Sequence, residues 1–370
     1  MKENERRVLS RDANPHLMRE IAFRGVTARN RIAFSPMCQY CATDGVPDDW
    51  HLVHLGSRAV GGAGIVFTEA THIEPRGRIT PHCLGLWNDA QAEAFARIVR
   101  FIEKQGAVPG IQLGHAGRKG STAQPWKGSG PLSPEEGGWE TIGPSALAFA
   151  DNYAPPREMT LEDIAEVTRA MAISAALARK AGFRIIEIHA AHGYLLHEFL
   201  SPLSNRRTDR YGGSFDNRIR LLREFIAAAR SEWPDDLPLF VRLSVSEWVE
   251  GGWNIEDSVR LAGILKADGH VDLIDCSSGG NDPRQKIAIH PGYQLPLSQA
   301  VRHGAGIATG AVGLLHSPDL CEQVLANGQA DLVILGRALM AEPYWPLQAA
   351  KRLGAPMKWP VQYERSNIYY

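Results

Sequence analysis

In Ile185-Ile186-Glu187-Ile188-His189-Ala190-Ala191-His192-Gly193-Tyr194, a short apolar run ends abruptly at two histidines and a tyrosine. The alternation of apolar side chains in its first half predicts a buried strand. His189 and His192 would point to opposite faces of a continuing strand, but they share one face if the chain turns after Ile188. Such a turn would aim both imidazoles at one bound molecule, with Tyr194 close by. The alternative is that both histidines are buried in the core, where neighbouring groups make their hydrogen bonds and neither contacts a ligand.

Short apolar runs of this kind recur along the chain and alternate with helical patterns. We expect strands at 31–34, 64–68, 108–113, 185–188, 239–243, 271–275, 307–309 and 332–335. Helical patterns lie at 90–105, 160–181, 217–232, 255–267 and 343–353. This alternation implies parallel pairing, so the sequence predicts a (β/α)8 TIM barrel. Polar residues at the C-terminal ends of barrel strands build the site, which places the two histidines at the mouth.

The remaining segments fit around one barrel. We expect residues 1–20 to form a loosely packed arm, 21–32 a hairpin that caps the bottom of the barrel, and 21–360 a single barrel domain with a tail at 361–370. The connection at 116–159, after the third strand, is rich in Gly, Pro and Ser. Loops longer than about 15 residues in compact domains are usually functional or disordered. We therefore expect this loop to cover the mouth.

Composition and charge exclude several classes of protein. The 370 residues are 44% hydrophobic and 22% charged, which is ordinary for a soluble enzyme, and the formal net charge is -1. No lysine-rich run is present, which argues against nucleic acid or an anionic membrane as a partner. The first residues lack the apolar core of a leader, and no segment approaches the roughly 18 apolar residues of a membrane span. We expect a cytoplasmic protein.

The five cysteines are too few and too scattered for a disulfide framework. Cys38 and Cys41 form a Cys-x-x-Cys that could suggest zinc or a redox dithiol, but no second pair of ligands stands at comparable spacing. No metal is expected. His51 and His54 repeat the three-residue spacing, yet they fall within a helical pattern and are expected to pack.

Several other polar residues fall at or near strand ends. Glycines in Thr309–Gly313 and Leu335–Arg337 follow the seventh and eighth strands, where barrels commonly bind phosphate. Arg242 and Gln112 lie within apolar runs, where an unpaired charge would be costly, so an anion or neighbouring acidic or backbone groups should meet them. At the tip of the first strand, Ser35–Tyr40 carries a thiol and a phenol. A thiol mechanism with a histidine base stays open.

Taken together, these stretches resemble the Old Yellow Enzyme family of flavin-dependent ene-reductases, from about Phe23 to Arg365. The sequences Arg207–Ser214 and Asn217–Arg218 look like the family's signature after the fourth strand. Cys38 stands where the branch of the yeast enzymes has threonine, so the chain resembles the thermophilic-like branch. No cysteine cluster follows the barrel, unlike in larger iron–sulfur relatives.

The resemblance implies non-covalent FMN. The positions that match the isoalloxazine and ribityl site are Ser35, Pro36, Met37, Ala70, Gln112 and Arg242. Gly313, Gly336 and Arg337 match the phosphate site. Cys38 matches a residue beside the reactive edge of the flavin that tunes its redox potential and substrate affinity.

The resemblance also implies a ping-pong reaction in one pocket. NADPH reduces FMN and leaves, and an α,β-unsaturated carbonyl compound takes its place. His189 and His192 donate hydrogen bonds to the carbonyl oxygen, Tyr194 protonates the α-carbon, and Tyr40 contacts the substrate. The tail resembles the segment that carries an arginine, here Arg365, into the active site of a neighbouring subunit, which implies a homodimer or homotetramer.

Two alternatives remain at this point. The first is a metal-dependent hydrolase on the same fold, with His189, His192 and either Glu187 or Glu198 as ligands. The second is a flavin-binding protein without catalysis, although such a protein has no need of Tyr194 as a proton donor.

Overall fold

The structure is a computed structural model that describes residues 14–369. Eight parallel strands close into a barrel in the order β10-β11-β12-β3-β4-β5-β8-β9. Their bounds are β3 Ile32–Phe34, β4 Ile65–His72, β5 Val108–Gly114, β8 Ile185–Ala190, β9 Leu239–Ser244, β10 Leu273–Ser277, β11 Ala308–Ala311 and β12 Leu332–Leu335. The predicted TIM barrel is confirmed, and the largest difference in strand bounds is four residues, at the C-terminal end of β4.

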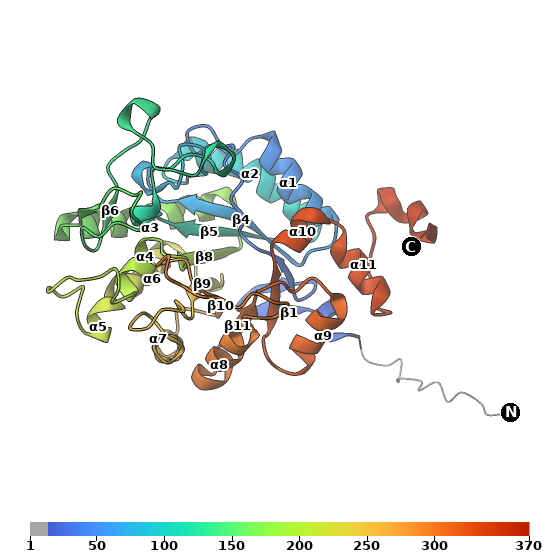
Figure 1. The fold of residues 1–370 in the computed structure, drawn as a ribbon. Helices are drawn as coiled ribbons and strands as arrows, with labels where there is room; N and C mark the ends of the chain where they lie inside the picture. Colours follow the sequence, from blue (N-terminus) through green and yellow to red (C-terminus); the bar gives the residue numbers. More distant parts are fainter. Residues whose placement is uncertain (1–13, 370) are drawn as a thin grey trace.

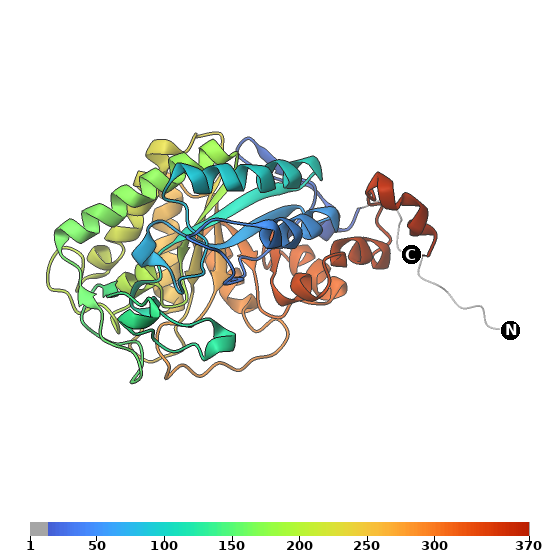
Figure 2. The ribbon, with the colours of Figure 1, turned by 90° about the horizontal axis from the view of Figure 1, so that it is seen from above.

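Helices surround the barrel and cover the outer face of its sheet (Figures 1 and 2). They are α1 Asp49–Val60, α2 Asp89–Lys104, α3 Leu161–Ala181, α4 Leu195–Leu200, α5 Phe215–Arg218, α6 Arg220–Glu232, α7 Ile255–Asp268, α8 Leu295–Ala305, α9 Pro318–Ala326, α10 Arg337–Ala341 and α11 Trp345–Arg352. The C-terminal 3-10 segment η6, Val361–Tyr369, projects away from the barrel beyond α11 in both views. Among the described residues, no helix is both long enough and apolar enough to cross a membrane.

The predicted hairpin at the bottom of the barrel is present as β1, Ile21–Phe23, and β2, Val26–Ala28. Its Phe23 ring packs edge-on against Phe240 at the start of β9, with 4.9 Å between ring centroids. The prediction of a loose arm is wrong for its described part. Leu17 is fully buried, and the backbone N–H groups of His16 and Leu17 donate to the Glu322 carboxylate on α9 at 2.9 and 2.8 Å. Residues 1–13 lie outside the described part.

We expect Phe240→Ala to destabilise the protein by about 3–5 kcal/mol. The Phe240 side chain is fully buried, and its ring also lies 6.2 Å from Phe67 on β4, so truncation opens a cavity between the barrel and the hairpin. Urea unfolding measures the change, and Phe240→Leu serves as the control because it leaves most of that volume filled. Equal midpoints for the alanine variant and wild type would show that the hairpin does not depend on this contact.

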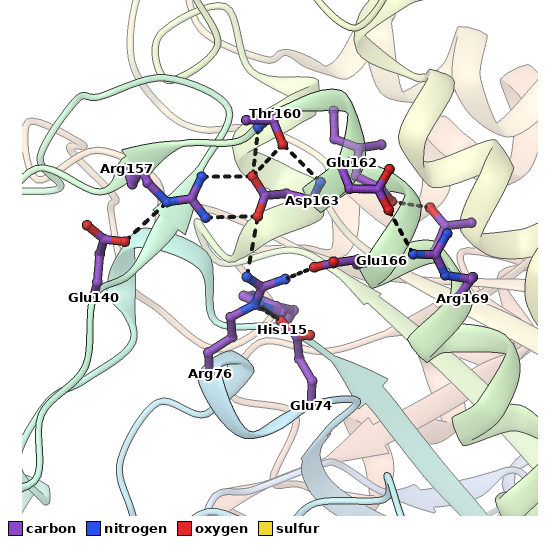
Figure 3. A network of polar contacts seen from close by, with 12 residues as sticks. Glu74, Arg76, His115, Glu140, Arg157, Thr160, Glu162, Asp163, Glu166 and Arg169 are labelled. Carbon is purple, nitrogen blue, oxygen red and sulfur yellow. Dashed lines mark hydrogen bonds and ion pairs between the residues drawn. The ribbon is translucent and has the colours of Figure 1, made fainter.

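The long loop at 116–159 contains the 3-10 turns η3 Gly117–Lys119, η4 Pro125–Lys127 and η5 Pro134–Glu136, and the short strands β6 Ile142–Gly143 and β7 Arg157–Glu158. A network of charged groups ties its end to α3 (Figure 3). Both terminal nitrogens of Arg157 donate to Asp163 at 2.8 Å, and the Asp163 carboxylate also accepts from the backbone N–H of Thr160. Thr160 caps α3 in return, as the sequence predicted.

Replacing Asp163 by Asn should lower stability by about 2 kcal/mol, because the guanidinium of Arg157 loses a buried charged partner. The Arg157 hydrogen bonds hold the pKa of Asp163 far below its ordinary value. A carboxylate with a depressed pKa in the folded state stabilises it above the unfolded pKa, near 4, and that contribution is lost as the pH falls. Thermal melting between pH 3 and 7 should therefore show a smaller acid loss for the variant. An identical acid loss in both proteins would contradict this.

Candidate active site

The tip of β8 brings together the three polar side chains of the opening motif. β8 runs on through Ala190, so the turn starts two residues later than predicted, at Ala191. The His189 ring lies edge-on to His192 and to Tyr194, with ring centroids 5.2 and 5.0 Å apart. His192 has a φ of 60° and Gly193 a φ of 73°, both in the left-handed region. A Cβ on Gly193 would lie 2.3 Å from the carbonyl oxygen of Gly280, so only glycine fits there.

The hydrogen bonds of the two imidazoles determine what each can do. The Nδ1 atom of His189 accepts from the backbone N–H of Ala191 at 3.2 Å, so its hydrogen is on Nε2, which is free to donate elsewhere. The Nε2 atom of His192 lies 2.6 Å from Oγ of Ser277. Burial, with the positive charge of Arg242, holds the pKa of both histidines well below its ordinary value. Both rings are therefore neutral at pH 7.

Tyr194 is a protonated phenol under the same conditions. Burial raises its pKa well above the ordinary value. The ammonium group of Lys119, from the long loop, lies 5.2 Å from the centre of its ring and donates to the carbonyl oxygens of His192 at 2.9 Å and Gly280 at 2.8 Å. The long loop thus covers the mouth of the barrel, as predicted.

Polar side chains from four strands form the floor below these rings. Nη1 of Arg242 on β9 donates to Oγ of Ser35 at 3.2 Å, and its Nε lies 3.2 Å from Asp275 on β10. Gln112 on β5 donates to Glu187 on β8 at 2.7 Å. Neighbouring acidic groups therefore meet both residues, which is one of the two alternatives left open by the sequence. Burial raises the pKa of both carboxyl groups, and the positive charge of Arg242 opposes this rise.

A cavity of about 480 Å³ opens beside this floor. It is lined by six of the predicted cofactor residues: Ser35, Met37, Arg242, Gly313, Gly336 and Arg337. The polar lining residues that were not predicted are Ser277, Tyr293, Gln294 and His316. Three of these come from the end of β10 and the loop before α8, where the run of serine and glycine at 277–280 is the one signal in the sequence.

The cavity suits a ligand with an anionic end. Its volume falls in the usual range for small-molecule and cofactor pockets. Arg337 and the glycines after β11 and β12 stand at one part of its wall, where barrels bind phosphate. Gly313 has a φ of 111°, and a Cβ on Gly336 would lie 2.8 Å from Sδ of Met37, so glycine keeps the backbone accessible at both positions. The residues present therefore fit a phosphate-bearing cofactor such as FMN.

The tip of β3 carries the thiol and the phenol. Cys38 and Tyr40 pack with Tyr194 against a small apolar cluster of Ile79, Cys83 and Ala116. Burial, together with the charge of Glu69, raises the pKa of the Cys38 thiol well above its ordinary value, which argues against a thiolate nucleophile. Tyr40 also lies edge-on to Trp126 of the long loop, with 6.1 Å between centroids.

The other predicted residues are placed as follows. Pro36 and Ala70 are buried, and Ala70 is the register partner of Gln112. Arg365 is exposed in η6. All five cysteines are free. His54 packs edge-on against Phe34, whereas His51 is a polar capping residue whose Nδ1 accepts from the backbone N–H of Asp48, which corrects the expectation of simple packing.

In the part of the chain that the structure describes, the β8 tip holds no group of three metal-ligating side chains close enough to share an ion. Within residues 14–369, the group of three close enough to share an ion is Cys41, Asp48 and His51, at the start of α1. Glu198, a proposed ligand of the hydrolase alternative, accepts from the backbone N–H of Arg118, and burial raises its pKa to about 8. A protonated carboxyl group is a poor metal ligand.

Comparisons with known proteins agree with this geometry. Residues 16–355 match the family described as the NADH:flavin oxidoreductase / NADH oxidase family. The NADPH dehydrogenase of Geobacillus thermodenitrificans is 48% identical over 344 residues, which cover 92% of this chain and 96% of that protein. The Old Yellow Enzyme homologue of Zymomonas mobilis has a similar structure, with a TM-score of 0.75 at 27% identity, covering 94% of this chain and 95% of that one.

A larger protein contains the same fold. A 2-naphthoyl-CoA reductase superposes with a TM-score of 0.84 at 28% identity over 92% of this chain, which spans about half, 52%, of its length. On the family match and these relatives, the chain belongs to the NADH:flavin oxidoreductase / NADH oxidase family, as a flavin oxidoreductase of the Old Yellow Enzyme type.

Proposed function

We propose that this protein is an ene-reductase that uses NADPH to reduce the C=C bond of α,β-unsaturated carbonyl compounds in a ping-pong reaction. As a flavin oxidoreductase of its family, it takes FMN as its cofactor. When bound, FMN would supply the hydride chemistry between the nicotinamide and the β-carbon of the substrate.

The protein's own groups would bind the cofactor non-covalently. Gly313, Gly336 and Arg337 would hold the phosphate, with Arg337 giving a charge-assisted contact. The ring and ribityl parts would lie along Ser35, Pro36, Met37, Cys38, Ala70, Gln112 and Arg242. Arg242 supplies the positive charge of the floor, and its Nη1 stays close to the cavity because Ser35 accepts from it.

The side chains at the β8 tip would act on the substrate. His189 and His192 donate hydrogen bonds to the carbonyl oxygen and stabilise the negative charge that grows there as the β-carbon is reduced. Tyr194 gives its proton to the α-carbon. Tyr40 contacts the substrate from the tip of β3.

One observation carries this proposal: the neutral His189 imidazole, with its free N–H on Nε2, lies 5.2 Å from the neutral His192 imidazole and 5.0 Å from the protonated Tyr194 phenol, measured between ring centroids. Reduction of an enone needs hydrogen-bond donors to its carbonyl oxygen and a proton source for its α-carbon. A protein that only binds flavin needs neither, and a hydrolase would need ionised carboxylates where Glu187 and Glu198 have raised pKa values.

The experiment is an anaerobic absorbance titration of the purified protein. We expect a flavin spectrum that bleaches with NADPH and returns when cyclohexenone is added. A protein that bleaches but is not restored by the enone would refute ene-reduction and leave the flavin oxidoreductase intact. A colourless protein that FMN cannot reconstitute would refute the placement of the cofactor.

Assembly and location are also proposals. We propose a homodimer or homotetramer in which exposed Arg365 of η6 reaches the substrate pocket of a neighbouring subunit, and a cytoplasmic enzyme that acts on small molecules. Nucleic acid and membrane are not expected as partners, because the charge is nearly balanced. Light scattering tests the assembly, and Arg365→Ala should raise KM for the enone.

A further inference from the structure

A buried histidine with no role in the proposed reaction holds the turn that carries His192 and Tyr194. The backbone N–H of Gly193, between these two residues, donates to Nδ1 of His197 at 2.9 Å. Because Nδ1 accepts, the neutral ring carries its hydrogen on Nε2. That nitrogen lies 3.0 Å from Oε1 of Glu247 in the loop after β9. Both side chains are fully buried.

Glu247 is placed to keep this arrangement fixed. Its carboxylate accepts from Oγ of Ser201 and the backbone N–H of Trp253, both at 2.9 Å, and from Nδ2 of Asn281 at 2.8 Å. Burial alone would raise the pKa of Glu247, but the contacts with His197 and Ser201 outweigh burial and hold it below its ordinary value. The group is therefore an ionised carboxylate, which selects the His197 tautomer whose hydrogen is on Nε2.

The turn needs such support because its backbone is unusual. Residues other than glycine rarely adopt a φ of 60°, the value at His192. Such a conformation persists only where several surrounding contacts hold the backbone in place. The backbone N–H of His192 donates to Ser244, and its carbonyl oxygen accepts from Lys119. The amide of Gly193 is the next group along the chain, and His197 is its acceptor.

We propose that His197 and Glu247 form a positioning pair for the enone reduction proposed above, on which this inference rests. Glu247 fixes the tautomer of His197, His197 fixes the amide of Gly193, and the turn then keeps the His192 imidazole and the Tyr194 hydroxyl aimed at one substrate. Neither residue of the pair exchanges a proton with the substrate.

Two substitutions at one position separate the two contacts of His197. In His197→Asn the side-chain oxygen replaces Nδ1, so the Gly193 bond is kept and the contact with Glu247 is lost. In His197→Gln the amide nitrogen reaches the place of Nε2, so the contact with Glu247 is kept and the amide of Gly193 loses its acceptor. His303→Gln, on the exposed end of α8, is the matched control for a histidine-to-glutamine change.

For holoenzyme with cyclohexenone, we expect His197→Gln to lose roughly 10- to 100-fold in kcat, because small misplacements of reacting groups cost about that much. KM should change less, FMN content and melting temperature should stay near those of wild type, and His197→Asn should retain most of kcat. Equal kcat in the two His197 variants would overturn the proposal. A loss of kcat in His197→Gln would also overturn the proposal if the melting temperature of that variant fell as well.

Two readouts of the protein itself do not depend on turnover. The ¹⁵N shifts of wild type should report His197 with an unprotonated Nδ1, and Glu247→Gln should give a mixture of tautomers. Hydrogen exchange at the Gly193 amide should accelerate in His197→Gln and not in His197→Asn. If wild type reduces no enone but these readouts behave as expected, the proposed function fails and the positioning of the turn stands. Unchanged exchange in both variants overturns the positioning.

Discussion

Tyr194→Phe should lower kcat for enone reduction by about 10²- to 10⁴-fold, the usual contribution of a positioned general acid. The phenol keeps its proton because burial raises its pKa well above the ordinary value, so it is available across the neutral range. The variant keeps the ring, and therefore the contact with His189 and the packing against Ile79, Cys83 and Ala116. Steady-state NADPH consumption with cyclohexenone measures the loss.

The matched control is Tyr211→Phe. The Tyr211 hydroxyl donates to Glu224 on α6 at 2.9 Å and has no part in the proposed reaction, so its removal should leave kcat unchanged. Bleaching of bound flavin by NADPH needs no proton from Tyr194 and should proceed at the wild-type rate in both variants. If Tyr194→Phe instead slows bleaching and enone reduction equally, the tyrosine shapes the pocket and does not deliver the proton.

Much of this site could be predicted because parallel barrels bring strand ends together. His189, Arg242 and Gln112 all lie in short apolar runs, where a polar residue requires a partner or a function. The identity of their partners depends on strand register, which the sequence does not reveal. Asp275 meets Arg242, and Glu187 meets Gln112, because these residues are register neighbours on adjacent strands.

Other features depend on contacts between distant parts of the chain. Ser277 reaches the cavity from the end of β10 and Gln294 from the loop before α8, and both residue types are common in ordinary turns. The sequence predicts a polar arm that includes residues 14–20. In the structure the Glu322 carboxylate on α9 accepts from the backbone there, and Leu17 is buried. Nothing in the sequence around His197 indicates a role for it. The structure shows that the Gly193 amide donates to it.

The double variant His189→Ala with His192→Ala should weaken enone binding and lower kcat/KM by about 10²- to 10³-fold, as expected when donors to a developing oxyanion are removed. FMN should remain bound, because the cavity is lined by Ser35, Arg242, Gly313 and Arg337 and by neither imidazole. Phenol binding, measured from the perturbed flavin spectrum, should fall together with enone binding, since both ligands present an oxygen to the same donors.

The pH dependence distinguishes neutral from charged donors. Both imidazoles have pKa values held well below the ordinary value by burial and by Arg242, so they donate as neutral rings. Enone affinity of wild type should therefore be flat between about pH 6 and 8, where an unperturbed histidine near 6.5 would titrate. A rise in affinity as the pH falls through that range would indicate an imidazolium donor. Loss of flavin from a double variant whose melting temperature is unchanged would instead place the histidines in the cofactor site.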